Sequence, residues 1–219
     1  MSDFTFSGYL EQEEVRAIIN ALPAVSCHAE RDTLFFELMW QSGARVSEAA
    51  TLVPEHIGMT SIVLRNLKQH KRIRDEATGR IKKVSDPSAL KEVEISASLC
   101  QSLKDYCDRN KIHEGDYVFK ATKGSGHIRR WYAWNIFNKA SEAARVYKFG
   151  KKHPRTGGRF KGACPHMLRH SNAMKLLEET KDIMIVKQQL GHASVRTTQG
   201  YAYVRAPRIR KEIAKMSWE

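Results

Sequence analysis

Arginine and histidine side chains stand at spacings that suit the binding of a phosphate group. His166 and Arg169 are three residues apart, so on a helix they share one face and both can reach a single phosphate. Arg45 is a second candidate, because its neighbours Gly43 and Ala44 do not favour a surface salt bridge. Attack on a phosphodiester builds negative charge on the non-bridging oxygens, and guanidiniums fixed in place stabilise that charge. These residues therefore suit phosphodiester chemistry.

A tyrosine near the C-terminal end could be the nucleophile of such a site. A phenol with a pKa of about 10 attacks poorly at neutral pH unless nearby cations and a base help to remove its proton. Tyr201 lies nine residues after His192, and His192 follows Gly191, a residue typical of a helix C-terminus. We therefore expect the imidazole of His192 on a loop. Tyr203 is the alternative nucleophile.

The positive charge of the chain is concentrated in three segments. The net charge is +13 over 219 residues. Residues 65–83 carry eight Lys and Arg, residues 145–161 carry seven and residues 205–215 carry five, while the remainder is mildly acidic. Basic strips on an acidic body are the pattern of a protein that binds a polyanion. We expect nucleic acid as the partner, and solvated loops that point in unrelated directions are the alternative.

The elements that must position these residues are mostly helical. Apolar residues at helical spacing, with Pro and Gly at the ends, predict helices at 10–22 (stopped by Pro23), 33–43, 44–52, 97–109, 131–147, 165–179, 182–190, 194–203 and from about 207. Residues 61–67 and 93–96 read as strands, separated by a charged loop that is either an extended hairpin tip or a third short strand. Residues 148–164 read as a mobile loop. The expected fold class is mostly α with a small antiparallel sheet (α+β).

Composition limits the class of protein and the cellular compartment that we expect. The chain is long enough to bury one sizeable core or two small ones, and its apolar stretches are too short to cross a membrane. The start of the chain lacks the pattern of a signal peptide. Four cysteines without a C-x-x-C pair are expected to be reduced thiols of the core. We expect a soluble cytoplasmic protein associated with the nucleoid.

Three motifs taken together indicate a family. SGARVSEAATL, HMLRHSNA and LGHASVRTTQGYAYV, in this order and with these gaps, resemble the catalytic domain of tyrosine recombinases, the phage-integrase-like family. The resemblance covers residues from about Leu10 to Val204. It implies a single catalytic domain over residues 1–219, with a core at 10–204 and a basic tail helix at 205–219. The chain begins about where the catalytic domain of the family starts, so we expect either a compact form that lacks the separate N-terminal core-binding domain of many family members or a domain that borrows this other half from elsewhere.

The resemblance implies a role for each motif residue. Arg45 and Arg169 would clamp the scissile phosphate, and His166 and His192 would hydrogen-bond to it and assist proton transfer. Tyr201 would attack and form a covalent 3′-phosphotyrosyl link, which stores the bond energy so that strands rejoin without ATP. The position two residues after this tyrosine is often histidine in the family, and a tyrosine stands there in this chain.

The family also uses a lysine of the hairpin to protonate the leaving 5′ oxygen. Lys68 is our choice, because it directly continues the apolar pattern of the first strand. The alternatives are Lys71, Lys82, Lys83 and Lys91. Glu48, one helical turn after Arg45, would orient that arginine or pair with a neighbouring histidine, and a plain capping or surface role is the alternative.

The resemblance and the basic segments together indicate which partners and cofactors to expect. We expect double-stranded DNA, contacted by Lys71, Arg72, Lys151, Lys152, Arg155, Arg159 and Lys161. A single domain should grip DNA weakly, so we expect a homo-oligomer, a tetramer on paired sites, with accessory DNA-bending proteins as further partners. We expect no metal and no other cofactor, because the histidines lack further zinc ligands within sequence reach.

The resulting hypothesis is a site-specific DNA recombinase or integrase. Within enzymes, the alternative is a resolving activity like that of type IB topoisomerases, which shares the chemistry. Outside enzymes, the alternatives are a catalytically inactive DNA-binding regulator on the same scaffold and a basic RNA-binding protein. An inactive regulator would have no physical reason to keep both arginines, both histidines and the tyrosine.

Overall fold

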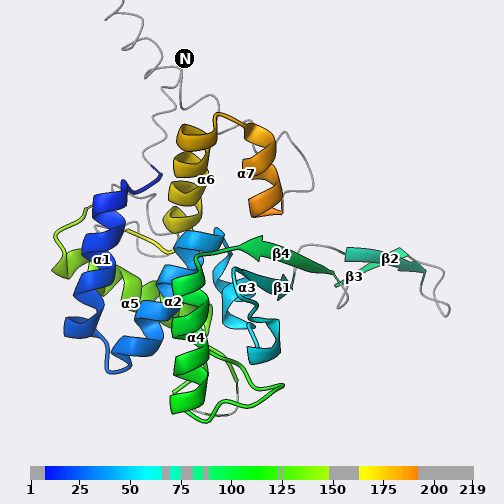
Figure 1. The fold of residues 1–219 in the computed structure, drawn as a ribbon, viewed down its shortest axis with the longest axis horizontal. Coiled ribbons are helices and arrows are strands. Elements are labelled where there is room, and N and C mark those ends of the chain that lie inside the picture. The colour runs from blue at the N-terminus through cyan, green and yellow to red at the C-terminus, as the bar shows by residue number, and fades with distance from the viewer. Residues whose placement is uncertain are drawn as a thin grey trace, which may run out of the picture.

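The computed structural model describes residues 8–65, 70–74, 81–85, 89–122, 124, 126–147 and 163–191, with residues 70–74 and 81–85 described by their backbone alone. The elements in these ranges confirm a mostly helical fold with small antiparallel sheets (Figure 1). In chain order they are α1 (Gln12–Val25), α2 (Ala29–Ser42), α3 (Val46–Ala50), the 3₁₀ helix η1 (Pro54–His56), β1 (Ser61–Arg65), β2 (His70–Arg74), β3 (Ile81–Ser85), β4 (Leu90–Glu94), α4 (Ala97–Arg109), α5 (Arg130–Ala143), α6 (His166–Thr180) and α7 (Ile183–Leu190).

Several helix ends follow directly from local sequence. The Ser96 hydroxyl accepts a hydrogen bond from the backbone N–H of Leu99 at the start of α4, and the Asp182 carboxylate accepts one from Met184 at the start of α7. Gly43 ends α2 and Gly191 ends α7, both in the left-handed conformation that glycine adopts without strain. The predicted helices at 97–109 and 182–190 are therefore confirmed.

The predicted end of the first helix before Pro23 is wrong. Helix α1 continues through Pro23 to Val25, and the backbone N–H of Ser26 still bonds to the carbonyl of Leu22 at 2.9 Å. A proline in the last turn removes only one backbone hydrogen bond. Ile18 and Leu22 are fully buried, so packing holds this turn in place.

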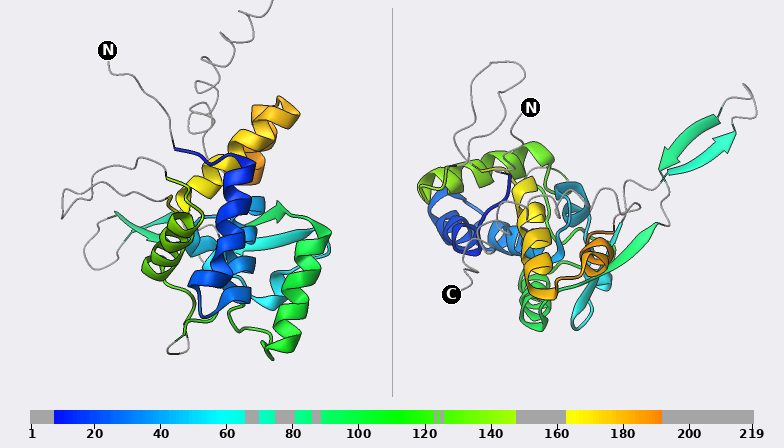
Figure 2. Two further views of the ribbon diagram at one scale, coloured as in Figure 1. Left: turned by 90° about the vertical axis from the view of Figure 1, so that its left-hand side faces the viewer. Right: turned by 90° about the horizontal axis from the view of Figure 1, so that it is seen from above.

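The prediction of two strands around a charged loop is confirmed in part, because β1 and β4 form and pair with each other, but the loop between them contains two further strands. The described ranges contain four strands in two antiparallel pairs, β1 with β4 and β2 with β3, and the second pair lies inside the predicted loop. The fourth strand begins at Leu90 rather than at Val93. Charged residues dominate β2 and β3, so their sequence lacks the apolar alternation by which a half-buried strand is recognised. The β2–β3 ribbon projects away from the helices (Figure 2).

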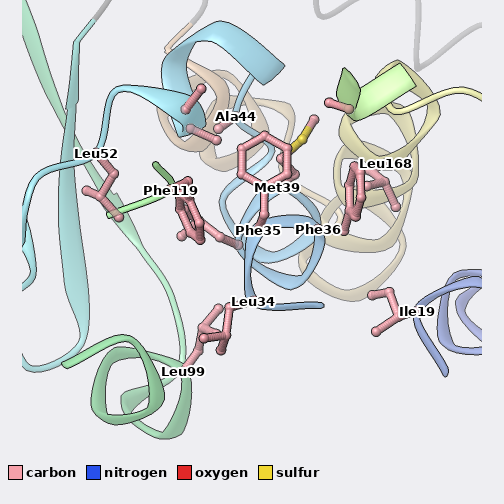
Figure 3. Close-up of a cluster of buried hydrophobic side chains, with 14 of the residues drawn as sticks. Ile19, Leu34, Phe35, Phe36, Met39, Ala44, Leu52, Leu99, Phe119 and Leu168 are labelled. Atoms are coloured by element: carbon pink, nitrogen blue, oxygen red, sulfur yellow. The ribbon is translucent and has the colours of Figure 1, made fainter. Parts of the chain in front are cut away.

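Helix α2 is the centre of the helical layer. It packs against α1, α4 and α6, while α6 packs against α7. Phe35 and Phe36 on α2 are fully buried, and Phe35 meets Phe119 edge-on with 5.1 Å between ring centroids (Figure 3). Phe36 contacts Phe137 of α5 at 4.9 Å. Aromatic packing of this kind fixes α2, and therefore fixes the chain where it leaves the helix at Gly43.

The cysteines only partly meet the expectation of core thiols. Cys100 and Cys107 are buried, and burial raises the pKa of the Cys107 thiol to about 11. Cys27 is exposed because it lies in the short connection between α1 and α2, and Cys164 is only half-buried. All four are free thiols. In the part of the chain that the structure describes, no helix is long and apolar enough to cross a membrane.

Candidate active site

The guanidinium of Arg169 lies where three elements meet. Arg169 is on α6 and is 2% exposed. Its Nη1 donates to the backbone carbonyl of Gly43 at the end of α2, and its Nη2 donates to the carbonyl of Leu190 at the end of α7, at 2.8 Å. The carbonyls at a helix C-terminus lack partners within the helix and carry partial negative charge, so they suit a buried cation. One side chain thus ties together the chain segments that lead to Arg45 and to His192.

Close packing at Gly43 brings these helix ends together. Gly43 has φ +62°, and a Cβ at this position would lie 2.4 Å from Cδ2 of Leu190 and 2.8 Å from Oδ1 of Asn172. Asn172 in turn donates its Nδ2 to the carbonyl of Gln41 at 2.8 Å. A residue with a side chain would separate α2 from α6 and α7. The tight packing therefore depends on glycine.

Arg45 and Glu48 form a pair at the start of α3. The guanidinium Nη1 of Arg45 lies 2.6 Å from Oε1 of Glu48, and the backbone N–H of Arg45 donates to Oε2 at 3.1 Å. Glu48 is fully buried, whereas the Arg45 side chain is 21% exposed. Glu48 therefore caps the helix and orients the arginine at once, and the alternative of a surface role for it is wrong. The charged end of Arg45 remains within reach of a ligand.

Lys91 of β4 joins this pair. Its Nζ lies 3.2 Å from Oε2 of Glu48, and its side chain is 10% exposed. From the sequence, Lys91 is only one alternative to Lys68 for the lysine that protonates the leaving oxygen. A clearer signal was available, because strand alternation puts Lys91 on the same face as the buried Val93 and Ile95. A lysine on the core face of a strand needs a buried partner.

The charges in the cluster influence one another. Burial alone would raise the pKa of Glu48, but the charges of Lys91 and Arg45 and the hydrogen bond from the Arg45 backbone outweigh it, so the pKa is lowered and the carboxylate stays ionised. Burial lowers the pKa of Lys91, and the charges of Arg169 and Arg45 lower it further against the effect of Glu48. Arg45 and Lys91 share the carboxylate of Glu48, and Arg169 adds a third cation near Lys91. The site therefore has an excess of positive charge that suits an anion.

His166 stands at the edge of the same cluster. It is exposed at the start of α6, and its ring meets that of His170 edge-on at 4.6 Å, as the spacing of the two residues predicts. His166 and Arg45 line one open groove of about 890 Å³. The other lining residues are Val46, Ser47, Arg130, Trp131, Trp134, Cys164 and Pro165. The groove gives a large ligand access to the two basic side chains.

The side chains of the remaining candidate residues are not among those that the structure describes. Lys68, His192 and Tyr201, with the alternative Tyr203, lie outside the described residues, as do Lys151, Lys152, Arg155, Arg159 and Lys161. Lys71 and Arg72 lie on β2, of which only the backbone is described. His192 follows Gly191 directly in sequence, so the chain enters the segment with His192 and Tyr201 from the cluster itself. Among the described side chains, no three His, Cys, Asp or Glu residues gather in a way that could hold a metal ion.

Comparison with known proteins identifies the family of this chain. Residues 8–208 match the model of the phage integrase family, so the chain belongs to that family. The chain is 30% identical over 208 residues to the tyrosine recombinase XerD of Corynebacterium glutamicum, an alignment that covers 92% of this chain and 59% of the relative.

Solved structures show the same fold. A crystal structure of XerA recombinase matches with a TM-score of 0.66 and 21% identity, over 96% of this chain and 65% of the other. XerH site-specific recombinase bound to its difH substrate matches with a TM-score of 0.64 and 20% identity, over 97% of this chain and 53% of the other. The chain thus spans between half and two thirds of the length of these relatives.

Proposed function

We propose that this chain is the catalytic domain of a site-specific DNA recombinase, which cleaves and rejoins DNA strands through a covalent 3′-phosphotyrosyl link to Tyr201. The observation that carries the proposal is a cluster of three cations: Arg45 and Lys91 pair with the buried carboxylate of Glu48, and the guanidinium of Arg169 lies near enough to lower the pKa of Lys91. Such a cluster has the charge that a phosphodiester needs as it becomes five-coordinate. Membership in the phage integrase family supports the same chemistry.

The arrangement of the arginines suits stabilisation of a transition state. Arg169 is oriented by two backbone carbonyls and Arg45 by an ionised carboxylate, so both guanidiniums are positioned before a substrate arrives. Groups that need no reorganisation during the reaction stabilise developing charge best. In the proposed mechanism both arginines bind the non-bridging oxygens of the scissile phosphate.

The other steps belong to the histidines, the tyrosine and a lysine. His166, with His192 from the segment after α7, donates hydrogen bonds to the phosphate and assists proton transfer. The Tyr201 oxygen attacks phosphorus, the bond to the 5′ oxygen breaks, and Lys68 protonates that oxygen as it leaves. The ester stores the energy of the broken bond, so religation needs neither ATP nor a metal ion.

Double-stranded DNA is the proposed partner. The basic segments supply contacts to the backbone through Lys71, Arg72, Lys151, Lys152, Arg155, Arg159 and Lys161. The XerH structure contains that recombinase bound to its difH substrate, which supports DNA as the ligand of this fold. We propose that residues 1–219 act as one domain within a tetramer on paired sites at the nucleoid, with accessory DNA-bending proteins. Affinity should fall steeply with salt, because binding releases counterions from the phosphates.

A nicked duplex that traps the covalent complex tests the proposal. The protein is incubated in EDTA with duplexes that carry a candidate site and a nick near the cleavage point, and a covalent protein–DNA band is sought on denaturing gels. Wild type and Tyr203→Phe should give the band and Tyr201→Phe should not. A band that survives Tyr201→Phe but is lost with Tyr203→Phe moves the nucleophile by two residues. DNA binding without any band supports the inactive regulator, and relaxation of supercoiled DNA without strand exchange supports the topoisomerase-like activity.

A further inference from the structure

One buried lysine connects the two halves of the proposed phosphate site. Lys91 Nζ approaches Oε2 of Glu48 at 3.2 Å on the side of α3. Its methylene stem runs over Gly191 at the end of α7, where an added Cβ would lie 2.9 Å from Cδ and 3.9 Å from Cε of Lys91. The backbone of Lys91 is held in β4 opposite Leu64 of β1. The side chain therefore links a strand to both helical segments that flank the site.

Lys91 contacts protein groups beside the groove rather than lining it. The groove lined by Arg45 and His166 does not include Lys91 among its lining residues. Its Nζ is buried and makes an ion pair with Glu48 rather than a well-aligned hydrogen bond. Glu48 is also the residue that orients the Arg45 guanidinium. The contacts through which Lys91 can orient groups at the groove are therefore those with Glu48 and Gly191.

We propose that Lys91 is a positioning residue of this active site. Its ammonium holds the carboxylate of Glu48 in the orientation that aims Arg45 at the phosphate, and its stem fixes the backbone of Gly191, directly before His192. The inference rests on the proposed function and adds a residue to it. The general acid that protonates the leaving oxygen is a different lysine, for which Lys68 is our choice.

Cleavage kinetics test the proposal. Lys91→Met keeps the stem and removes the charge, Lys91→Arg keeps a charge, and Lys120→Met is a matched control that breaks the exposed 3.0 Å pair with Asp116. Lys91→Met should bind duplex DNA within about threefold of wild type but cleave it about 10- to 100-fold more slowly at saturation, the loss expected of misplacement near 1 Å. Lys91→Arg should recover most of the rate, and Lys120→Met should match wild type. Unchanged cleavage by Lys91→Met overturns the proposal.

A substrate with sulfur in place of the bridging 5′ oxygen separates positioning from proton donation. A thiolate leaves without a proton, so this substrate rescues a variant that lacks the general acid. Lys91→Met should remain as slow, relative to wild type, on the sulfur substrate as on the ordinary one. Restoration to the wild-type rate overturns the positioning role and makes Lys91 the acid.

Thermal unfolding tests whether Lys91 and Glu48 interact, and it needs no cleavage assay. Lys91→Met and Glu48→Gln should each lower the unfolding temperature, because the first leaves the buried carboxylate with one cation fewer and the second leaves Lys91 without its ion-pair partner. The double variant should lose less than the sum of the two. Additive losses overturn the proposed link. If wild type forms no covalent complex, the proposed function fails, while this comparison still shows whether Lys91 holds Glu48.

Discussion

Replacing Gly43 by alanine should destabilise the fold and the phosphate site together. The backbone at Gly43 has φ +62°, a conformation that costs a residue with a Cβ about 1–2 kcal/mol. The new methyl would also lie 2.4 Å from Cδ2 of Leu190 and 2.8 Å from Oδ1 of Asn172, both on packed elements. Overpacking of this kind costs about 1–3 kcal/mol. The expected loss in the free energy of unfolding is therefore about 2–5 kcal/mol.

Gly115 provides the matched control, because it has φ +81° but nothing within 4 Å of an added Cβ. Gly115→Ala should lose only the backbone part, about 1–2 kcal/mol. Urea titration followed by circular dichroism gives both free energies of unfolding. Gly43→Ala should also cleave DNA more slowly, because the Gly43 carbonyl orients Arg169. If Gly43→Ala cost no more than Gly115→Ala, the close packing of α2 against α6 and α7 would be refuted.

Three further predictions concern charge and packing. The pKa of Glu48 is lowered from its ordinary value of 4.5, so the ionised carboxylate stabilises the fold fully above about pH 4.5. This stabilisation is lost as the pH falls through the lowered pKa. The unfolding temperature of Glu48→Gln should therefore decline less below about pH 5 than that of wild type. Arg169→Lys keeps the charge but leaves a buried carbonyl without its donor, so urea titration should show a loss of about 1–3 kcal/mol, and an unchanged midpoint would contradict this. Phe35→Ala should cost about 3–5 kcal/mol in the same assay. Met59→Ala, at a residue 82% exposed, should stay within about 0.5 kcal/mol, and equal losses would show that the core is misplaced.

Local features of the site could be predicted from the sequence, because they depend on residues a few positions apart. The three-residue spacing of His166 and Arg169 put both on one helix, and that of Arg45 and Glu48 put a carboxylate beside a guanidinium. Gly191 ended its helix as expected. In each case one helical turn or one cap decides the geometry.

Long-range features could not be predicted in the same way. The bond from Arg169 to the carbonyl of Gly43 spans 126 positions and depends on how α2 and α6 pack. The pairing of Lys91 with Glu48 depends on the register of β4 against β1. A charged segment also concealed the β2–β3 pair, because its backbone hydrogen bonds, which form between strands, leave no apolar signature in the sequence.

The most direct test of the central claim is to locate the covalent bond. The trapped protein–DNA complex would be digested with nuclease and trypsin, and the modified peptide sequenced by tandem mass spectrometry; residues 197–205 form one tryptic peptide that contains both Tyr201 and Tyr203. The proposed mechanism predicts a nucleotide joined through its 3′ phosphate to the Tyr201 oxygen. A nucleotide on any other residue, or one joined through a 5′ phosphate, would contradict it.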